Sequence, residues 1–406
     1  MLNKFELFIF MKKKIAIYTE SFPPKSGGVA VAQYNLYHLL KNLYDIKIFV
    51  YSEDNDSFDN EVIKRKAPRS LFFFLRFFVL AYLRFRVKKQ SSFASTLNIF
   101  KTGLRIKRLN KELHRFNPDY IIMPDHFLPI YNIQKTSNCK LFWAAHHNYS
   151  RFTNNPLLQT DWADLYVCQN MEYKAFKKAD GLICPSNYMQ GIANNTLKPT
   201  FKSHVIYNFL STDLLSSIEP RFIYEEVNLQ VNYPIIYLPS AGTIVKGKKY
   251  IFEIIRRIGA QMNNKVVFYL SGPIPSDLKY ELNTIQGAFI FAPGNISWEH
   301  NLGIVKTCSI GVTPNLVENF SYAILEAHFL GLPFVAFDTG GNNEIIEDNS
   351  SGFIVPYLGI EQLIEKTMFL LNNLDKRDAF GKNAESRCKR LFSKEVILDQ
   401  YAALFK

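Results

Sequence analysis

Short apolar runs alternate with longer stretches of helical periodicity along this chain. Apolar runs rich in β-branched and aromatic residues fall at residues 14–19, 46–51, 120–123, 140–145, 181–184 and 204–207. After a break near residues 208–231, similar runs fall at 234–240, 266–270, 288–291, 310–313, 333–337 and 352–355. Strands that are apolar throughout and separated by helices are typical of parallel sheets covered by helices. The two series predict an α/β chain of two doubly wound, Rossmann-like domains that face each other across a cleft.

The length and the composition agree with two domains. The chain has 406 residues, 48% of them hydrophobic, and its mean hydropathy is −0.07. A chain of this size is long enough for two cores. We expect one domain at residues 11–207, a second at 208–392 and a terminal helix at 393–406. The apolar run in residues 1–10 is short and broken by Glu6, so we interpret it as an upstream extension and not a secretion signal.

The clearest chemistry lies between residues 317 and 331. Ser321 is a good helix N-cap, residues 322–330 form a short apolar helix, and Gly331 ends it. Glu318 then lies on the preceding loop and Glu326 about one turn into the helix. The amides of residues 320–322 begin the helix and favour a bound phosphate. A carboxylate on each side of a diphosphate can accept the hydroxyls of two sugars, which fits a nucleotide-sugar.

This segment resembles the Glu-x7-Glu motif of retaining glycosyltransferases of the GT-B fold, especially family 4. Six further landmarks resemble that family in the matching order: residues 22–29, His146-His147, residues 179–186, Tyr207-Asn208-Phe209, Lys246-Gly247, and residues 338–344 with their Gly340-Gly341 pair. Together they cover the chain from about residue 14 to about residue 395.

The resemblance implies a role for each matching residue. It implies that Lys246 binds the phosphate, Glu318 the donor sugar and Glu326 the nucleotide ribose, while His146 acts at the catalytic site. It also implies a first domain that binds the acceptor, a second that binds the donor, and a terminal helix that crosses back to the first. Neither a metal nor a cofactor is expected. The donor-binding set implied is Gly27, Gly28, Lys246, Lys248, Asn319, Phe320, Ser321, Tyr322 and Glu326, and the catalytic set is His146, Lys246 and Glu318.

The chain departs from the family pattern in its phosphate loop. The usual loop has Gly-Arg several residues before Lys-Gly, whereas residues 242–247 read Gly-Thr-Ile-Val-Lys-Gly. The arginine is missing and the loop is shorter, and arginine and lysine are not equivalent at such a position. Lys248 is the candidate to compensate. Asn319 and Ser321 stand where the family has glycines before its second carboxylate.

Two pairs of residues follow predicted strands of the first domain. His146 and His147 follow the strand at 140–145, and we expect one of them, His146, to enter the cleft. Asp125-His126 follows the strand at 120–123 and is a second candidate, for the acceptor site. Asp54-x-Asp56 resembles the metal-binding carboxylates of the other glycosyltransferase fold, but it lies in a polar acidic loop that we interpret as solvated surface.

The net charge of +12 is concentrated in one segment. Residues 62–111 contain fourteen lysines and arginines and no acidic residue, so the rest of the chain sums to 12 − 14 = −2. The segment contains a run at 71–83 that is apolar or aromatic except for Arg76, too short for the about 20 residues that span a bilayer. We interpret residues 64–108 as contacting an anionic membrane surface. The alternative is a core-facing helix with a solvated basic rim; nucleic acid is not expected, because no known binding module accompanies the patch.

The five cysteines, Cys139, Cys168, Cys184, Cys308 and Cys388, form no Cys-x-x-Cys pair. This scattered, odd set predicts reduced thiols, no structural zinc, and a cytoplasmic location.

The leading hypothesis is a retaining hexosyltransferase that is peripheral at the inner face of a membrane. It would move a sugar from a nucleoside diphosphate to a lipid-linked or surface-polysaccharide precursor. Alternatives are a non-catalytic, membrane-associated GT-B-like partner protein, a nucleotide-sugar epimerase and a glycoside hydrolase. The hydrolase needs no diphosphate site. The base, the sugar, the linkage, the acceptor and the oligomeric state stay open.

Overall fold

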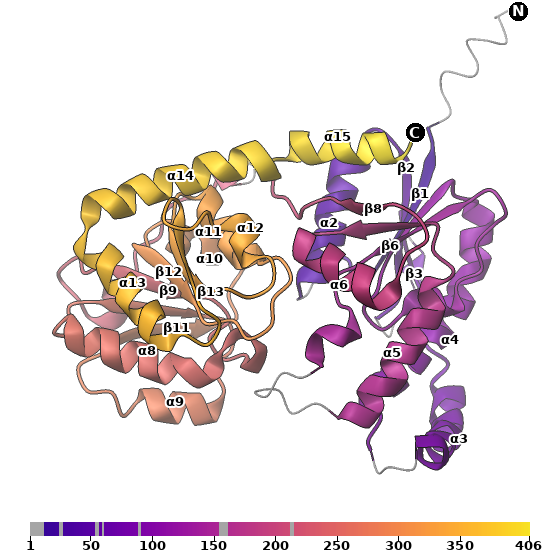
Figure 1. Cartoon of the computed structure of the whole chain (residues 1–406), viewed down its shortest axis with the longest axis horizontal. Coiled ribbons are helices and arrows are strands. Elements are labelled where there is room, and N and C mark those ends of the chain that lie inside the picture. Colours follow the sequence, from indigo (N-terminus) through magenta and orange to yellow (C-terminus); the bar gives the residue numbers. More distant parts are fainter. Residues whose placement is uncertain are drawn as a thin grey trace, which may run out of the picture. The chain divides into compact units, whose positions relative to one another are not determined.

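A computed structural model of the chain describes residues 12–23, 27–52, 57–58, 61–87, 91–153, 161–211 and 215–406. The chain divides into two compact units (Figure 1). Unit 1 comprises Met1–Tyr207 with Leu398–Lys406, and unit 2 comprises Asn208–Ile397. Each unit is a mostly parallel sheet covered by helices, so the predicted α/β fold of two Rossmann-like domains is confirmed.

The described part of unit 1 contains an eight-stranded sheet of order β3-β4-β2-β1-β5-β6-β7-β8. All neighbouring strands are parallel except β3 and β4. β1 is central and buried at five of its six positions, because an inner strand of a covered parallel sheet meets helices on both faces. The strands are β1 (Lys14–Thr19), β2 (Asp45–Val50), β3 (Ser57–Phe58), β4 (Val62–Lys64), β5 (Tyr120–Pro124), β6 (Lys140–Ala144), β7 (Gly181–Cys184) and β8 (Ser203–Val205).

Five α-helices accompany this sheet in the described residues of unit 1. They are α2 (Gly28–Leu40), α3 (Arg69–Val87), α4 (Ala94–Phe116), α5 (Trp162–Phe176) and α6 (Asn187–Leu197), and short 3-10 turns include η1 (Pro129–Asn132) and η2 (Tyr149–Phe152). The α4 and α5 helices each bury one face against the sheet or against one another. The α3 helix differs, because Leu83 is its one buried residue. A core-facing helix was the alternative considered for this segment, and the structure contradicts it.

Unit 2 contains, in its described residues, a six-stranded parallel sheet of order β11-β10-β9-β12-β13-β14. Its α8 helix shows why such helices form, since Tyr250, Ile251, Ile254, Ile255 and Ile258 recur at helical spacing and are all buried. The strands are β9 (Ile235–Leu238), β10 (Val267–Ser271), β11 (Phe289–Gly294), β12 (Ile310–Thr313), β13 (Phe334–Phe337) and β14 (Gly352–Val355). The helices are α8 (Lys248–Gln261), α9 (Ser276–Leu282), α10 (Trp298–Val305), α11 (Tyr322–Phe329), α12 (Asn342–Ile345), α13 (Ile360–Asn372) and α14 (Leu374–Phe392), with the 3-10 turns η3 (Glu225–Val227) and η4 (Ile244–Lys246).

Every apolar run that predicted a strand forms one, with ends that differ by at most three residues. The prediction missed β3 and β4, which fall in or just after the segment interpreted as a polar loop. These strands are short, and the pattern gave no signal because Ile63 is the one residue of β4 that is buried. Residues 1–10, Pro24 to Ser26, and the Asp54-x-Asp56 pair lie outside the described residues.

The end of the chain packs into the core of unit 1. The helix α15 (Lys394–Leu404) is followed by Phe405, which is 2% exposed. Its ring lies 4.9 Å from the ring of Tyr120 and 5.5 Å from that of Tyr44. Its carbonyl accepts hydrogen bonds from the Tyr120 hydroxyl at 2.9 Å and from the Lys13 ammonium at 2.7 Å. The last residues are therefore part of the structure of unit 1.

Replacing this anchor should destabilise unit 1. Truncation of a buried phenylalanine leaves a cavity, so we expect Phe405→Ala to lower the free energy of unfolding by about 3 to 5 kcal/mol. Urea unfolding followed through the fluorescence of the buried Trp143 would measure it. Leu374→Ala, at a position 57% exposed in unit 2, is the control and should change this transition by less than about 0.5 kcal/mol. Equal unfolding curves for wild type and Phe405→Ala would contradict the anchoring role.

Candidate active site

The predicted carboxylates lie where the topology of unit 2 reverses. β9 and β12 are neighbours, but β9 connects to β10 on one side and β12 to β13 on the other. Ligands of doubly wound sheets bind beyond the carboxyl ends of the strands at such a switch point. Lys246 lies in η4, on the connection that follows β9, and Glu318 lies on the loop that follows β12. Residues 72 positions apart therefore meet at one sheet edge.

Lys246 and Glu318 form a direct ion pair. The Lys246 ammonium donates to Oε2 of Glu318, whose side chain is 9% exposed. The same oxygen accepts from the Asn315 amide at 2.7 Å, and Oε1 accepts from the backbone N–H of Asn319 at 3.0 Å. A buried carboxylate needs such a cation and such donors to offset its lost hydration. Sequence analysis missed Asn315, although its place directly after β12 marked it as an edge residue.

Glycines allow three loops of this site, those after β9, β12 and β13, to lie close together. Gly247 has φ +85°, and a Cβ there would lie 2.1 Å from the carbonyl oxygen of Pro314. Gly340 has φ +62°, and a Cβ there would lie 2.4 Å from the carbonyl oxygen of Glu318. The N–H of Gly341 donates to the Asn319 carbonyl at 2.8 Å. The glycines of the Lys-Gly and Gly-Gly landmarks thus allow a backbone approach that no side chain permits.

The second predicted carboxylate, Glu326, lies in α11 in a different environment. Ser321 caps this helix, as predicted, by accepting from the Ile324 N–H at 3.4 Å. Glu326 is 9% exposed, and its Oε1 accepts from the indole N–H of Trp298 at 2.8 Å. Burial raises the pKa of Glu326 to about 7, and the indole hydrogen bond opposes that rise. Trp298, the first residue of α10, carried no motif and was missed by the sequence.

The remaining donor-site predictions in unit 2 fall into two groups. Asn319, Phe320, Ser321 and Tyr322 lie between the two carboxylates, and the Phe320 ring packs in the core, 5.4 Å from the ring of Phe392. Phe320 therefore offers its backbone and not its side chain. Lys248 lies in α8 and pairs with Asp277, so it is Lys246, and not Lys248, that joins Glu318.

In unit 1 a buried aspartate fixes the loop that carries the predicted histidine. Asp125 follows β5, is 0% exposed, and accepts three backbone N–H groups. Oδ1 accepts from His146 at 2.9 Å and from His147 at 2.7 Å, and Oδ2 accepts from Asn148 at 3.0 Å. Asp125 was a candidate to shape the acceptor site directly. Its burial means that it acts through the conformation of residues 146–148 instead.

The two adjacent histidines have different surroundings. The ring of His147 lies 4.7 Å from the rings of His126 and Tyr149 and 5.1 Å from that of Phe152. None of these three rings contacts His146 in the described part of the chain. Burial, with a smaller effect of Arg151, lowers the pKa of His146 to about 4. Burial, with smaller effects of His126 and Arg151, lowers the pKa of His147 well below its ordinary value. Both rings are therefore neutral at pH 7 and can accept or donate a hydrogen bond.

A carboxylate that sequence analysis missed joins this edge of unit 1. Glu20 directly follows β1, and one of its oxygens pairs with Nδ1 of His126, which follows β5. β1 and β5 are neighbours at the switch point of the first sheet. The position of Glu20 at the end of a central strand was the available signal.

The glycines predicted for the donor site lie at the start of α2. Gly27 is the N-cap of this helix with φ +88°, and Gly28 is its first residue. Both are exposed, and a Cβ at Gly27 would have no atom within 4 Å. Space around Gly27 is thus available, while the preceding residues 24–26 lie outside the described part.

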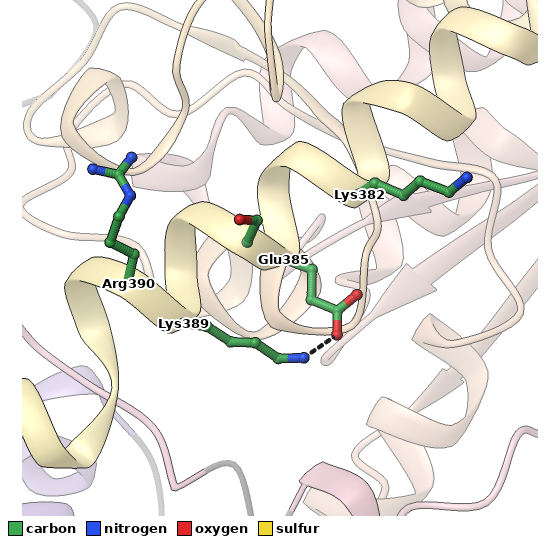
Figure 2. Close-up of a pocket in the computed structure, with 5 residues that line it drawn as sticks. Lys382, Glu385, Lys389 and Arg390 are labelled. Carbon is green, nitrogen blue, oxygen red and sulfur yellow. Dashed lines mark hydrogen bonds and ion pairs between the residues drawn. The ribbon is translucent and has the colours of Figure 1, made fainter.

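Two other arrangements were considered as sites. Within the described residues, no three His, Cys, Asp or Glu side chains come together as a metal site. A hollow of about 540 Å³ on α14 is lined by Lys382, Glu385, Ser386, Lys389 and Arg390. Figure 2 shows that Lys382 and Arg390 extend away from one another and that Lys389 is paired with Glu385, at 2.5 Å. This hollow contains none of the residues that the sequence predicts for a site.

The sequence matches two family profiles that together cover most of the chain. Residues 221–387 match the family described as Glycosyl transferases group 1, and residues 26–214 match Glycosyltransferase Family 4. A curated relative is Alpha-maltose-1-phosphate synthase of Mycolicibacterium smegmatis, 22% identical over 255 residues. The alignment covers 58% of this chain and 65% of that relative, so the chain spans slightly less than two thirds of it.

Solved structures share the fold over nearly the whole chain. Sucrose-phosphate synthase from Thermosynechococcus elongatus superposes with a TM-score of 0.73 at 17% identity, covering 97% of this chain and 98% of that one. An Anabaena protein, Alr3699/HepE in complex with UDP-glucose, superposes with a TM-score of 0.65 at 15% identity, covering 96% and 98%. At these identities the likeness shows the fold.

The environment of Glu326 predicts a pH-dependent stability. The folded state keeps the Glu326 proton up to about pH 7, whereas the unfolded chain loses it near the ordinary value of 4.5. The folded state binds more protons between these values, so its stability falls as pH rises from about 4.5 to about 7. Glu326→Gln removes this titration, so the free energy of unfolding should fall less over this pH range than in the wild type, by up to about 3 kcal/mol. Urea unfolding at pH 5 and pH 8 measures it; the exposed Glu281→Gln is the control, and parallel pH profiles for wild type and Glu326→Gln would contradict the assignment.

Gly340 predicts a second effect, on the geometry of the site. Gly340→Ala should destabilise unit 2 by about 1 to 3 kcal/mol, because the new Cβ collides with the Glu318 carbonyl in addition to the unfavourable φ. The control is Gly294→Ala, where φ is +79° and no atom lies within 4 Å. Gly294→Ala should lower the free energy of unfolding by about 1 kcal/mol, because only the unfavourable φ contributes. Equal losses in the two variants would show that the close approach to Glu318 is unimportant.

Proposed function

Because this chain belongs to the GT-B glycosyltransferases of the family 4 type, we propose that it transfers a sugar from a nucleoside diphosphate sugar with net retention. The observation that carries this proposal is the pairing of Lys246 with Glu318 at the switch point of unit 2, with Glu326 nearby in α11. One cation and two buried carboxylates match the needs of a diphosphate flanked by two sugars.

Each of these residues has a task in donor binding. We assign the donor diphosphate to the Lys246 ammonium, which neutralises Glu318 in the free protein. Glu318 accepts a hydroxyl of the transferred sugar. Glu326 accepts ribose hydroxyls through the carboxylate that the Trp298 indole holds in place. The start of α11, capped by Ser321, supplies backbone amides beside the departing phosphate.

The chemical step needs charge stabilisation more than a base. As the sugar–phosphate bond breaks, negative charge grows on the diphosphate, and Lys246 with the helix start stabilises it without a metal or cofactor. In a front-face displacement, the departing phosphate accepts the proton of the acceptor hydroxyl, and the new bond forms on the same face. His146, neutral at pH 7, hydrogen-bonds a hydroxyl of the donor or acceptor. We assign acceptor binding to unit 1 on this basis.

We propose a lipid-linked or surface-polysaccharide precursor as the acceptor, and a peripheral position at the inner, cytoplasmic face of a membrane. The support is the basic segment at 62–111 and the exposed aromatic side chains of α3.

One observation favours a second candidate, a non-catalytic partner protein with the same fold. Residues 242–247 lack the arginine that the family places before Lys246. Lys248 does not replace it at Glu318, because Lys248 pairs with Asp277. Such a protein would bind donor without turnover.

Donor binding is tested by thermal shift with UDP-, GDP-, ADP- and dTDP-sugars. We expect one nucleotide series to stabilise the wild type. Lys246→Ala and Glu326→Ala should weaken binding at least about tenfold, as the loss of one charge-assisted contact predicts. Lys248→Ala is the matched control and should stay within about threefold. If no nucleotide-sugar stabilises the wild type, the proposal is wrong.

Turnover separates the transferase from the non-catalytic partner. Nuclear magnetic resonance of the product should show the anomeric configuration of the donor, and slow donor hydrolysis should fall in Lys246→Ala. Binding without hydrolysis or transfer would favour the partner protein, and an inverted product would overturn retention.

A further inference from the structure

The α3 helix exposes an extensive apolar surface. Seven large hydrophobic side chains of this 19-residue helix are between 44% and 79% exposed, whereas Leu83 alone is buried. A protein rarely leaves so many aromatic rings in water unless the surface has a partner. The exposed side chains are Leu71, Phe73, Phe74, Phe77, Phe78, Tyr82 and Phe85.

One side of α3 attaches it to unit 1. Val79, Leu80, Leu83 and Val87 form a small apolar cluster with residues of the connection to α4 and of α5. Nearer the start of the helix, the Phe72 ring lies 6.1 Å from that of Phe100 in α4. Figure 1 shows α3 at the margin of unit 1, next to the lower parts of α4 and α5. The attachment fixes which side of the helix faces outward.

The outward side is apolar and uncharged. Phe74, Phe78, Ala81 and Phe85 follow one another at spacings of three and four residues, so they share a side, away from Val79 and Leu83. The Phe74 and Phe78 rings pack 5.3 Å apart, and those of Phe73 and Phe77 lie 5.6 Å apart. The aromatic side chains thus form a continuous surface along the helix.

Arginines border this surface. Arg69, Arg76, Arg84 and Arg86 are all exposed, and none forms a hydrogen bond or ion pair with another described residue. Arg84 and Arg86 lie between the outward side and the attached side, whereas Arg69 and Arg76 share the helical sector of Leu83 nearer the start of the helix. On α5, Trp162 and Tyr166 are 53% and 55% exposed and are sequence neighbours of Ala163 and Val167, which contact the α3 cluster.

The positive charge around α3 indicates which partner covers its apolar surface. The segment from Val62 to Lys111 has fourteen basic residues and no acidic one, although the rest of the chain sums to −2. A second copy of the chain would bring an equally basic α3 against the first, which like-charge repulsion opposes. In the described part of the chain, no helix has both the length and the hydropathy to cross a bilayer. Aromatic rings flanked by free arginines suit the headgroup region of an anionic membrane.

We propose that α3 lies flat in the surface of an anionic membrane and is the element that docks this protein there. Phe74, Phe77, Phe78 and Phe85 enter the acyl boundary, and Arg84 and Arg86, which flank them, contact lipid phosphates. Trp162 and Tyr166 extend the same surface. This inference deepens the proposed function, since it rests on a transferase that acts on a membrane-bound acceptor, but the docking itself does not depend on the donor site.

Vesicle co-sedimentation tests the docking. We expect the full chain to bind vesicles of 70% phosphatidylcholine and 30% phosphatidylglycerol at least about tenfold more tightly than pure phosphatidylcholine, with added salt weakening the binding. The variant Phe74→Ser/Phe78→Ser/Phe85→Ser should lose at least about tenfold, because the apolar contacts that it removes supply most of the insertion. The matched control is Phe222→Ser/Tyr280→Ser/Leu374→Ser, whose positions are 57% to 77% exposed in unit 2. It should bind like wild type; equal binding by both triple variants would overturn the proposal.

A fluorescence experiment tests the insertion. Phe78→Trp in a Trp162→Phe background should show a blue shift on vesicle binding and quenching by brominated acyl chains. Binding without quenching would indicate electrostatic adsorption only and would overturn the insertion. Sedimentation without vesicles gives a further control: a dimer that the α3 triple variant abolishes would assign the surface to a second copy instead.

The two proposals fail in different ways. The α3 triple variant should keep the thermal shift with nucleotide-sugar, because none of the predicted donor residues lies in α3. Loss of vesicle binding with the donor shift intact supports docking by α3. If the protein binds vesicles through α3 but no nucleotide-sugar causes a thermal shift in any variant, the docking proposal holds and the transferase proposal is wrong.

Discussion

The burial of one carboxylate, that of Glu318, is the constraint on which the arrangement of unit 2 depends. A carboxylate 8% exposed must find a cation and hydrogen-bond donors nearby. Lys246 supplies the cation from the loop after β9, and Asn315 and the Asn319 amide supply the donors. These contacts require the loop after β9 to touch the loop after β12, which requires glycine at position 247. Gly340 lets the loop after β13 approach the backbone of Glu318 as well. The ion pair of Lys246 with Glu318 and the glycines that allow the loops to approach therefore depend on one another.

Unit 1 meets the same constraint by a different route. Asp125 is buried and is stabilised by three backbone N–H groups, with no described cation in hydrogen-bond contact. These hydrogen bonds fix the loop that carries His146. In unit 2 a lysine offsets the buried carboxylate at the switch point, whereas in unit 1 backbone N–H groups offset it. The two units therefore stabilise a buried carboxylate in different ways.

Much of this structure could be predicted from the sequence, for identifiable reasons. Continuous apolar runs such as those at β1 and β12 predict buried parallel strands, and Ser321 with Gly331 delimits α11. The short strands β3 and β4 were not predicted, because β3 is an edge strand of two residues and β4 beside it buries one residue, Ile63. The sequence also did not predict that Lys248 pairs with Asp277 or that Trp298 contacts Glu326. Each contact joins two different elements, and one sequence alone does not show how those elements pack. Strand ends locate a site from the sequence, but the partners of each side chain follow only from packing.

The position of Phe405 affects the order in which the two units can fold during synthesis. Unit 2 is a continuous insertion between the two segments of unit 1, and Leu398–Lys406 are synthesised after it. Unit 2 can therefore complete its core while the nascent chain is still growing, whereas unit 1 needs Phe405 to cover Tyr120 and Phe142. Until Phe405 leaves the ribosome, the unit that is synthesised first is the less complete of the two.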